Sequence, residues 1–273
     1  MTLFWPTLVI GLLFLIPFFL LVQVSFAHRD PGGLWSPGFE FTHYQAFLQP
    51  LFLETLTFSA FLAILVALAA TALALPFAHF LTRMSRRAQV VWLVFLLSTL
   101  ALSEVLIVFA WQVMLARRIG LSNILVFLGI LDEPQSLSPN FGALFVCLIH
   151  FVLPYTVLLL YPALSRLDRQ VTEAARTMGA TNFRAFMTVT VPMVRGPLIA
   201  AVLLVFIFTI GTFVAPLVLG RPEHWTLAIL IQRTALTTGN MPFAAAMAMF
   251  LLFTTVVIAI ATAWLGGRGE IKR

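Results

Sequence analysis

Six apolar runs, each near the length that a helix needs to cross a lipid bilayer, account for most of this chain. Such a helix takes about 20 apolar residues, so each run is predicted to be one membrane-spanning helix. Only 10% of the 273 residues are charged, whereas about 25% is usual in soluble domains. The sequence predicts an all-α integral membrane protein, with residues 1–273 forming a single transmembrane domain. The six runs are residues 4–26, 51–82, 88–115, 141–164, 197–219 and 243–265.

The first run has a rival interpretation as a secretory signal, because Ser25 and Ala27 at its end are small residues. A signal peptide has a positively charged start and an apolar stretch of about 7–15 residues. This run has no such start and is longer, so we expect an uncleaved transmembrane helix.

Arginines predict how the six helices are oriented. An even number of spans puts both termini on one side, together with the loops 83–89 and 165–196. That side carries eleven of the 16 Lys and Arg residues and the other side five. By the positive-inside rule both termini and the loop 165–196 are predicted to be cytoplasmic. No basic run is longer than a pair such as Arg86-Arg87, so a nucleic-acid partner is not expected.

The residues that usually bind metals are scattered. The single Cys147 lies inside an apolar run, which excludes a disulfide framework within the chain and a Cys-based metal site. His79 and His150 lie in predicted helices with no carboxylate at ligand spacing. We expect hydrogen bonds between helices from these histidines and no metal site.

The polar loop 165–196 has the pattern of two short helices joined by an elbow. Ser165 followed by Asp168 fits a capping box, which predicts that a helix begins there. Gly179 is the expected stop, because glycine adopts the left-handed conformation after a helix at least cost. Thr181 or Asn182 would then cap a second helix.

That second helix is predicted over residues 183–190, and Pro192 is expected to end it. Glu173 lies at the spacing for pairing with Arg169 or Arg176 in the first helix. The elbow carries a shallow surface of small residues that a partner protein could contact, and the alternative is an ordinary connector packed on its own helices. This surface consists of Ala174, Ala175, Met178 and Ala180, beside Phe183.

The same loop resembles the EAA motif of the membrane subunits of binding-protein-dependent ABC importers. The motif also lies where that family has it, in the cytoplasmic loop between the fourth and fifth of six helices. The anchors present are Glu173-Ala174-Ala175, Gly179, Val189, Val191 and Pro192. The resemblance covers nearly the whole chain and implies the type I permease fold of these importers.

The resemblance also implies partners. Two permease subunits line one path, the second expected to be a paralogue, and two cytoplasmic ABC ATPases bind their EAA loops. A periplasmic binding protein delivers the solute, and the complex lies in the bacterial inner membrane. By this comparison the coupling surface consists of Glu173, Ala174, Ala175 and Gly179, with Ala180 and Phe183.

The sequence has no Gly-rich phosphate-binding loop ending in Lys-Ser or Lys-Thr. We therefore expect a transport subunit without ATPase activity of its own. It would need no cofactor, because ATP and Mg would be bound by the partner ATPase.

The closest resemblance is to the spermidine/putrescine class, through Pro154-Tyr155, Leu167-Asp168 and the stretch from Gly211 to Gly220. A polyamine-like solute is the leading expectation, and ferric iron, a phosphonate or an opine are the alternatives. An ion-coupled carrier or a membrane enzyme is the alternative class. An enzyme would have only His79, His150 and Glu104 in the membrane.

Glu54 lies at the opening of the run 51–82, and Glu104 is the only acid in the interior of an apolar run. An intramembrane carboxylate is a functional candidate by default. Glu104 could offset the desolvation of a cationic solute, or it could be protonated or bonded to a neighbour such as Ser103. Aromatic walls suit alkylammonium groups, although aromatic side chains more often face lipid. The candidate path residues are Glu104, Trp111, Gln112, Tyr155 and Phe213.

Overall fold

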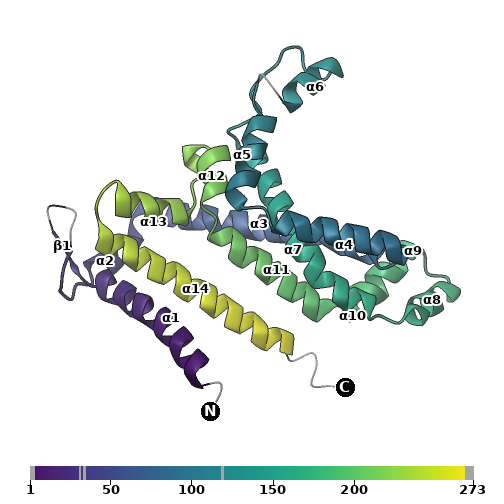
Figure 1. Ribbon diagram of the computed structural model, residues 1–273, viewed down its shortest axis with the longest axis horizontal. Helices are drawn as coiled ribbons and strands as arrows, with labels where there is room; N and C mark the ends of the chain where they lie inside the picture. Colours follow the sequence, from purple (N-terminus) through teal and green to yellow (C-terminus); the bar gives the residue numbers. More distant parts are fainter. Residues whose placement is uncertain (1–3, 31, 33–34, 118–119, 268–273) are drawn as a thin grey trace. The chain divides into compact units, whose positions relative to one another are not determined.

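A computed structural model describes residues 4–30, 32, 35–117 and 120–267, and most of them are helical (Figure 1). Helices occupy all six apolar runs, so the all-α prediction is confirmed. The helices in these runs are α1 (Phe4–Ser25), α3 (Pro50–Leu81), α4 (Arg86–Leu100), α5 (Glu104–Met114), α7 (Phe141–Ser165), α11 (Arg195–Ile210), α12 (Val214–Leu219) and α14 (Met241–Gly267).

Three helices, α3, α7 and α14, are long and apolar enough to cross a membrane unaided. Two bent pairs raise the number of candidate spans among the described residues to five: α4 with α5, and the helical segment 182–193 with α11. The segment Gly11–Ser25 of α1, taken alone, is apolar but shorter than the length required for a span.

The run 88–115, predicted as one helix, is in fact two helices bent by 96° from each other. The side chain of Ser103 accepts a hydrogen bond of 3.3 Å from the backbone N–H of Val105, which starts a new helix. Glu104 is therefore the first residue of α5 and does not lie within a continuous helix.

The run 197–219 is likewise divided, with residues 211–213 separating α11 from α12. Pro216 has no backbone N–H, so it cannot bond the carbonyl of Thr212 as a helix would require. Thr212 is buried, and its backbone N–H turns back to the carbonyl of Thr209.

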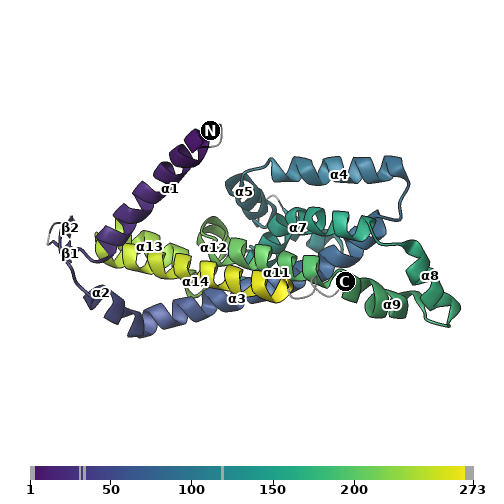
Figure 2. The same cartoon turned by 90° about the horizontal axis from the view of Figure 1, so that it is seen from below.

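The chain divides into two compact units, and the larger comprises residues 60–224 and 258–273. Its central helix is α7, which packs against α4, α5, α11 and α12 (Figures 1 and 2). Asn140 caps the start of α7 by accepting 2.8 Å from the N–H of Ala143. Ten residues of α7 are buried, among them Pro154, so the helix forms the core of this unit.

The smaller unit comprises residues 1–59 and 225–257. An antiparallel pair of two-residue strands, β1 (His28–Arg29) and β2 (Trp35–Ser36), follows α1, with His28 opposite Ser36. Phe52, Leu227 and Met247 are fully buried together. The short helices of this unit are α2 (Thr42–Gln45), η1 (Ala46–Leu48) and α13 (Leu227–Leu236). The larger unit also has the short helices α6 (Leu121–Phe127) and η3 (Pro222–His224), besides those in the polar loop after α7.

Candidate functional site

The polar loop after α7 begins with the helix α8 (Arg169–Thr177). The carboxylate of Asp168 caps it by accepting 2.9 Å from the backbone N–H of Gln170, which satisfies one of the donors left free at a helix start. Ser165 is instead the last residue of α7, and its hydroxyl donates to the carbonyl of Pro162. The capping box predicted from Ser165 is therefore wrong, because Asp168 alone makes the cap.

Gly179 ends α8 as predicted. Its φ of +91° is in the left-handed region, which costs glycine least. The N–H of Ala180 bonds the carbonyl of Ala175 at 3.1 Å, and the N–H of Gly179 bonds that of Arg176 at 3.0 Å. These two bonds are the Schellman pattern, and they close a tight turn between the two helices.

Thr181 caps the second helix, since its hydroxyl accepts 3.2 Å from the N–H of Arg184. This helix runs through α9 (Asn182–Ala185), a π-helical turn η2 (Phe186–Thr190) and α10 (Val191–Met193).

Pro192 does not end the second helix, contrary to the prediction. It lies in α10, directly after the π-helical turn η2, where the backbone hydrogen bonds already depart from the α-helical pattern. The change of direction follows at Val194, and α11 leaves at 79° to the segment 182–193.

Two large apolar side chains stand at the turn between α8 and α9. Met178 is 86% exposed and Phe183 is 70% exposed. Ala174 beside them is exposed, whereas Ala175 and Ala180 are half-buried. Phe183 was predicted as a contact residue, but Met178 is still more exposed; its signal in the sequence is a large apolar residue directly before the turn glycine. In both views α8 and α9 lie beyond the end of α7 (Figures 1 and 2). We call the exposed pair Met178 and Phe183 the elbow tip.

The elbow is anchored to the membrane helices behind it. Ala185 and Thr190 in the second helix, and Val194 after it, are buried. The ring of Phe186 lies 4.9 Å from that of His79 near the end of α3. The second helix of the elbow is therefore packed against the end of α3 and leads directly into α11.

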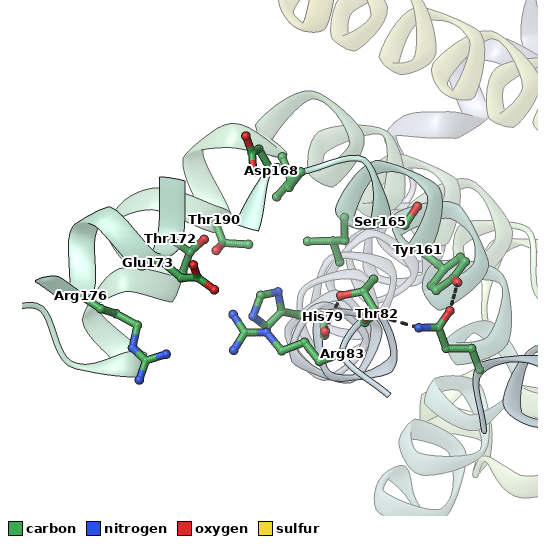
Figure 3. A pocket seen from close by; sticks show the side chains of 13 residues that line it. His79, Thr82, Arg83, Tyr161, Ser165, Asp168, Thr172, Glu173, Arg176 and Thr190 are labelled. Atoms are coloured by element: carbon green, nitrogen blue, oxygen red, sulfur yellow. Dashed lines mark hydrogen bonds between the residues drawn. The ribbon is translucent and has the colours of Figure 1, made fainter. Parts of the chain in front are cut away.

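Glu173 and Arg176 both line two neighbouring cavities. One of about 410 Å³ lies between α8 and the ends of α3 and α7 (Figure 3), and the other, of about 620 Å³, lies inside the elbow beside Thr181. Glu173 and Arg176 form no ion pair in the part of the chain that the structure describes. The side chain of Arg169, the other predicted partner, lies outside the described residues.

The candidate path residues fall into separate groups. The carboxylate of Glu104 accepts 3.1 Å from the hydroxyl of Thr212, which precedes Phe213. The indole N–H of Trp111 donates 3.1 Å to His150, so the predicted hydrogen bond between helices is confirmed for that histidine.

Tyr155 lies apart from these pairs, with its ring 5.1 Å from that of Phe208 on α11. Gln112 is exposed. No group of three or more metal-ligating side chains is found among the described residues.

Together, these features describe a class: a multi-pass membrane protein with a helix–turn–helix elbow beyond the end of its central helix. Residues 70–266 match the family of the binding-protein-dependent transport system inner membrane component, and the chain belongs to that family. It is therefore the permease subunit of an ABC importer, a multi-pass inner-membrane protein and a non-catalytic component of the transport system.

Permease proteins of ABC transporters are similar to this chain over most of its length. It is 27% identical over 245 residues to the spermidine/putrescine transport system permease protein PotB of Escherichia coli (strain K12), covering 90% of this chain and 88% of PotB. The similarity to PotB of Haemophilus influenzae is 26% over 246 residues, covering 90% and 85%. The inner membrane ABC transporter permease protein YdcU of Escherichia coli is 26% identical over 222 residues, covering 77% and 68%.

Two solved structures share the fold. A bacterial ABC transporter involved in the import of the acidic polysaccharide alginate gives a TM-score of 0.75 at 17% identity, covering 100% of this chain and 95% of that one. The alginate transporter in complex with alginate pentasaccharide-bound periplasmic protein gives 0.77 at 16% identity, covering 99% and 94%.

Proposed function

We propose that this permease imports a polyamine by alternating access. The observation that carries the proposal is the similarity, along 90% of the chain, to permeases named for spermidine and putrescine. The fold likeness to the alginate importer does not bear on the cargo, because at that identity it reflects architecture alone.

The proposed topology has six spans with both termini in the cytoplasm. The 22 residues of α1 are long enough to cross when the helix is counted whole, and the bent helix pairs supply two further spans. The arginine distribution then puts the elbow in the cytoplasm.

The proposed partners follow from the elbow. An ABC ATPase would receive the elbow tip, Met178 and Phe183, in an apolar groove, while Glu173, Ala174, Ala175, Gly179 and Ala180 complete the contact. Two such ATPases would bind ATP and Mg. A second permease subunit, expected to be a paralogue, and a periplasmic binding protein would complete the importer.

The proposed path passes the breaks in the helices. Glu104 is the first residue of α5 and lies at a helix break, and a carboxylate there suits the ammonium group of a polyamine. Discontinuous helices near the membrane midplane are a common setting for transported ions and solutes. Trp111, Gln112, Tyr155 and Phe213 are the further proposed path residues.

The cargo is tested with the complete complex in proteoliposomes, supplied with its binding protein and with ATP inside. We expect ATP-dependent uptake of labelled spermidine or putrescine that unlabelled polyamine suppresses and ferric iron, phosphonate or opine does not. Uptake of one of those other solutes instead would refute the polyamine assignment. Uptake that does not require ATP but depends on an ion gradient would indicate a secondary carrier.

A further inference from the structure

The cavity between α8 and the ends of α3 and α7 is a candidate binding site separate from the elbow tip. Its volume is about 410 Å³, and side chains from several elements of the larger unit line it, among them α3, α7 and α8 (Figure 3). Arg83 comes from the residues after α3, Thr172 and Arg176 from α8, and Thr190 from the end of η2.

Hydrogen-bond donors in this cavity outnumber the groups that could satisfy them. The guanidinium groups of Arg83 and Arg176 form no ion pair with any residue that the structure describes. Thr190 is 1% exposed, and its hydroxyl has no hydrogen-bond partner within the described ranges. Since buried polar groups are almost always hydrogen-bonded, the Thr190 hydroxyl indicates an acceptor supplied from outside the chain.

Two carboxylates also line the cavity, but they lie in different places. Asp168, which caps α8, lies apart from Arg83 and Arg176, whereas Glu173 lies nearer to the two arginines (Figure 3). Glu173 forms no ion pair among the described residues. The part of the cavity that holds the two guanidinium groups therefore has one carboxylate, which favours an anion and disfavours a polyamine.

We propose that this cavity binds a phosphate group between Arg83 and Arg176, with the Thr190 hydroxyl as a further donor. Guanidinium groups match the oxygens of phosphate with paired hydrogen bonds. The volume leaves room for the molecule that carries the group. The phosphate comes either from a small cytoplasmic compound or from a lipid headgroup.

A phosphate held here would connect two moving parts. Arg83 follows the span α3 and Arg176 lies on α8, so the bound group would tie the elbow to the membrane helices. This step rests on the proposed coupling role of the elbow: if the elbow moves during transport, a phosphate bound in the cavity would restrain that movement and so regulate transport. The binding itself does not depend on that role.

The test uses the full chain in a maltoside detergent, whose headgroup has no phosphate, at constant ionic strength. Inorganic phosphate and short-chain phosphatidylglycerol are titrated separately by calorimetry. Saturable binding of phosphate alone assigns a free phosphate compound, and binding of the lipid without phosphate assigns the headgroup.

Variants locate the site. Arg83→Gln and Arg176→Gln should each weaken binding about tenfold, the usual effect of losing one charge-assisted bond. Glu173→Gln should tighten binding, because it removes a repelling charge. Arg184→Gln, an exposed arginine of the same loop outside the cavity, should have no effect.

The proposal fails if neither probe binds saturably, or if Arg184→Gln weakens binding as much as Arg83→Gln. Should a glutamine variant fold poorly by circular dichroism, Arg83→Lys keeps the charge and is expected to retain part of the affinity. The assay contains no ATPase and no polyamine, so its failure and the failure of the transport proposal are separate results.

Discussion

The hydroxyl of Thr212 donates a hydrogen bond of 3.1 Å to the carboxylate of Glu104, and the two residues lie at the breaks that divide α11 from α12 and α4 from α5. These residues are 108 positions apart in the chain. A single side-chain contact thus joins two helix breaks, which the packing of α5 against α12 holds together.

Glu104→Gln should lower the kcat/KM of polyamine uptake by at least about tenfold, because a hydrogen bond to a charged group contributes about 1.5–3 kcal/mol. The amide keeps the shape and can still accept from Thr212. Thr212→Val removes that bond but leaves the carboxylate, so it should affect uptake less. Wild-type uptake in Glu104→Gln would exclude the path role.

Met178→Ser and Phe183→Ser should each weaken ATPase association at least about tenfold, since burying such a side chain contributes about 1.5–3 kcal/mol. The amount of ATPase retained on the immobilised permease measures this. Met193→Ser is the control, because this methionine is 40% exposed in α10, at the opposite end of the helical segment 182–193 from Phe183. Equal losses in all three variants would argue against a defined tip.

Gly179→Ala should destabilise the end of α8 by about 1–2 kcal/mol, the cost of a left-handed conformation for an L-residue. An added Cβ meets nothing within 4 Å at this glycine, so the cost is backbone strain alone. Faster amide hydrogen exchange over residues 169–177 reports it. Gly196→Ala has equal space without a positive φ and should leave exchange unchanged; the elbow turn is misassigned if both behave alike.

Ser59→Ala should destabilise the smaller unit by about 1–3 kcal/mol, the cost of a buried group left unsatisfied. The buried Ser59 hydroxyl accepts 2.8 Å from the N–H of Leu227, and alanine offers no replacement. Thr57→Ala removes an exposed hydroxyl bonded within its own helix and should be nearly neutral. Thermal unfolding of the two variants side by side decides the point.

Glu40 should make the strand pair sensitive to acid. Its hydrogen bonds with His28 and then Thr42 hold its pKa below the ordinary value. A carboxyl whose folded pKa is depressed adds stability that is present above the unfolded pKa and is lost as the pH falls through the folded pKa. The hydrogen-exchange protection factors of the β1 and β2 amides, which correct for the intrinsic pH dependence of exchange, should therefore fall in acid, and Glu40→Gln should remove most of this decrease. An unchanged acid profile in the variant would assign the effect elsewhere.

Much of the fold could be predicted from the sequence because lipid leaves few choices. Apolar runs of spanning length must be helical, since a backbone in hydrocarbon has to satisfy its own hydrogen bonds. The elbow was predictable for a local reason too. Gly179 and Thr181 act through their own backbone neighbours, so their roles follow from residue type and spacing.

The helix breaks were not predictable from hydropathy. The runs 88–115 and 197–219 stay apolar through Ser103 and Thr212, and a capping bond or a proline interrupts the helix without changing the pattern. The position of Pro192 was misjudged for a similar reason, because a proline can also lie directly after a π-helical turn, where the backbone hydrogen bonds depart from the α-helical pattern.

The sequence by itself determined the membrane helices, the motif of the elbow and the family resemblance, because each depends on residue types at fixed spacing. Only the tertiary structure decided that Glu104 is hydrogen-bonded to Thr212, that the side chain of Met178 is almost fully exposed, and that Arg83 lines the same cavity as Arg176. These relationships join residues far apart in the chain or depend on exposure. They arise from how helices pack, and no local pattern encodes that.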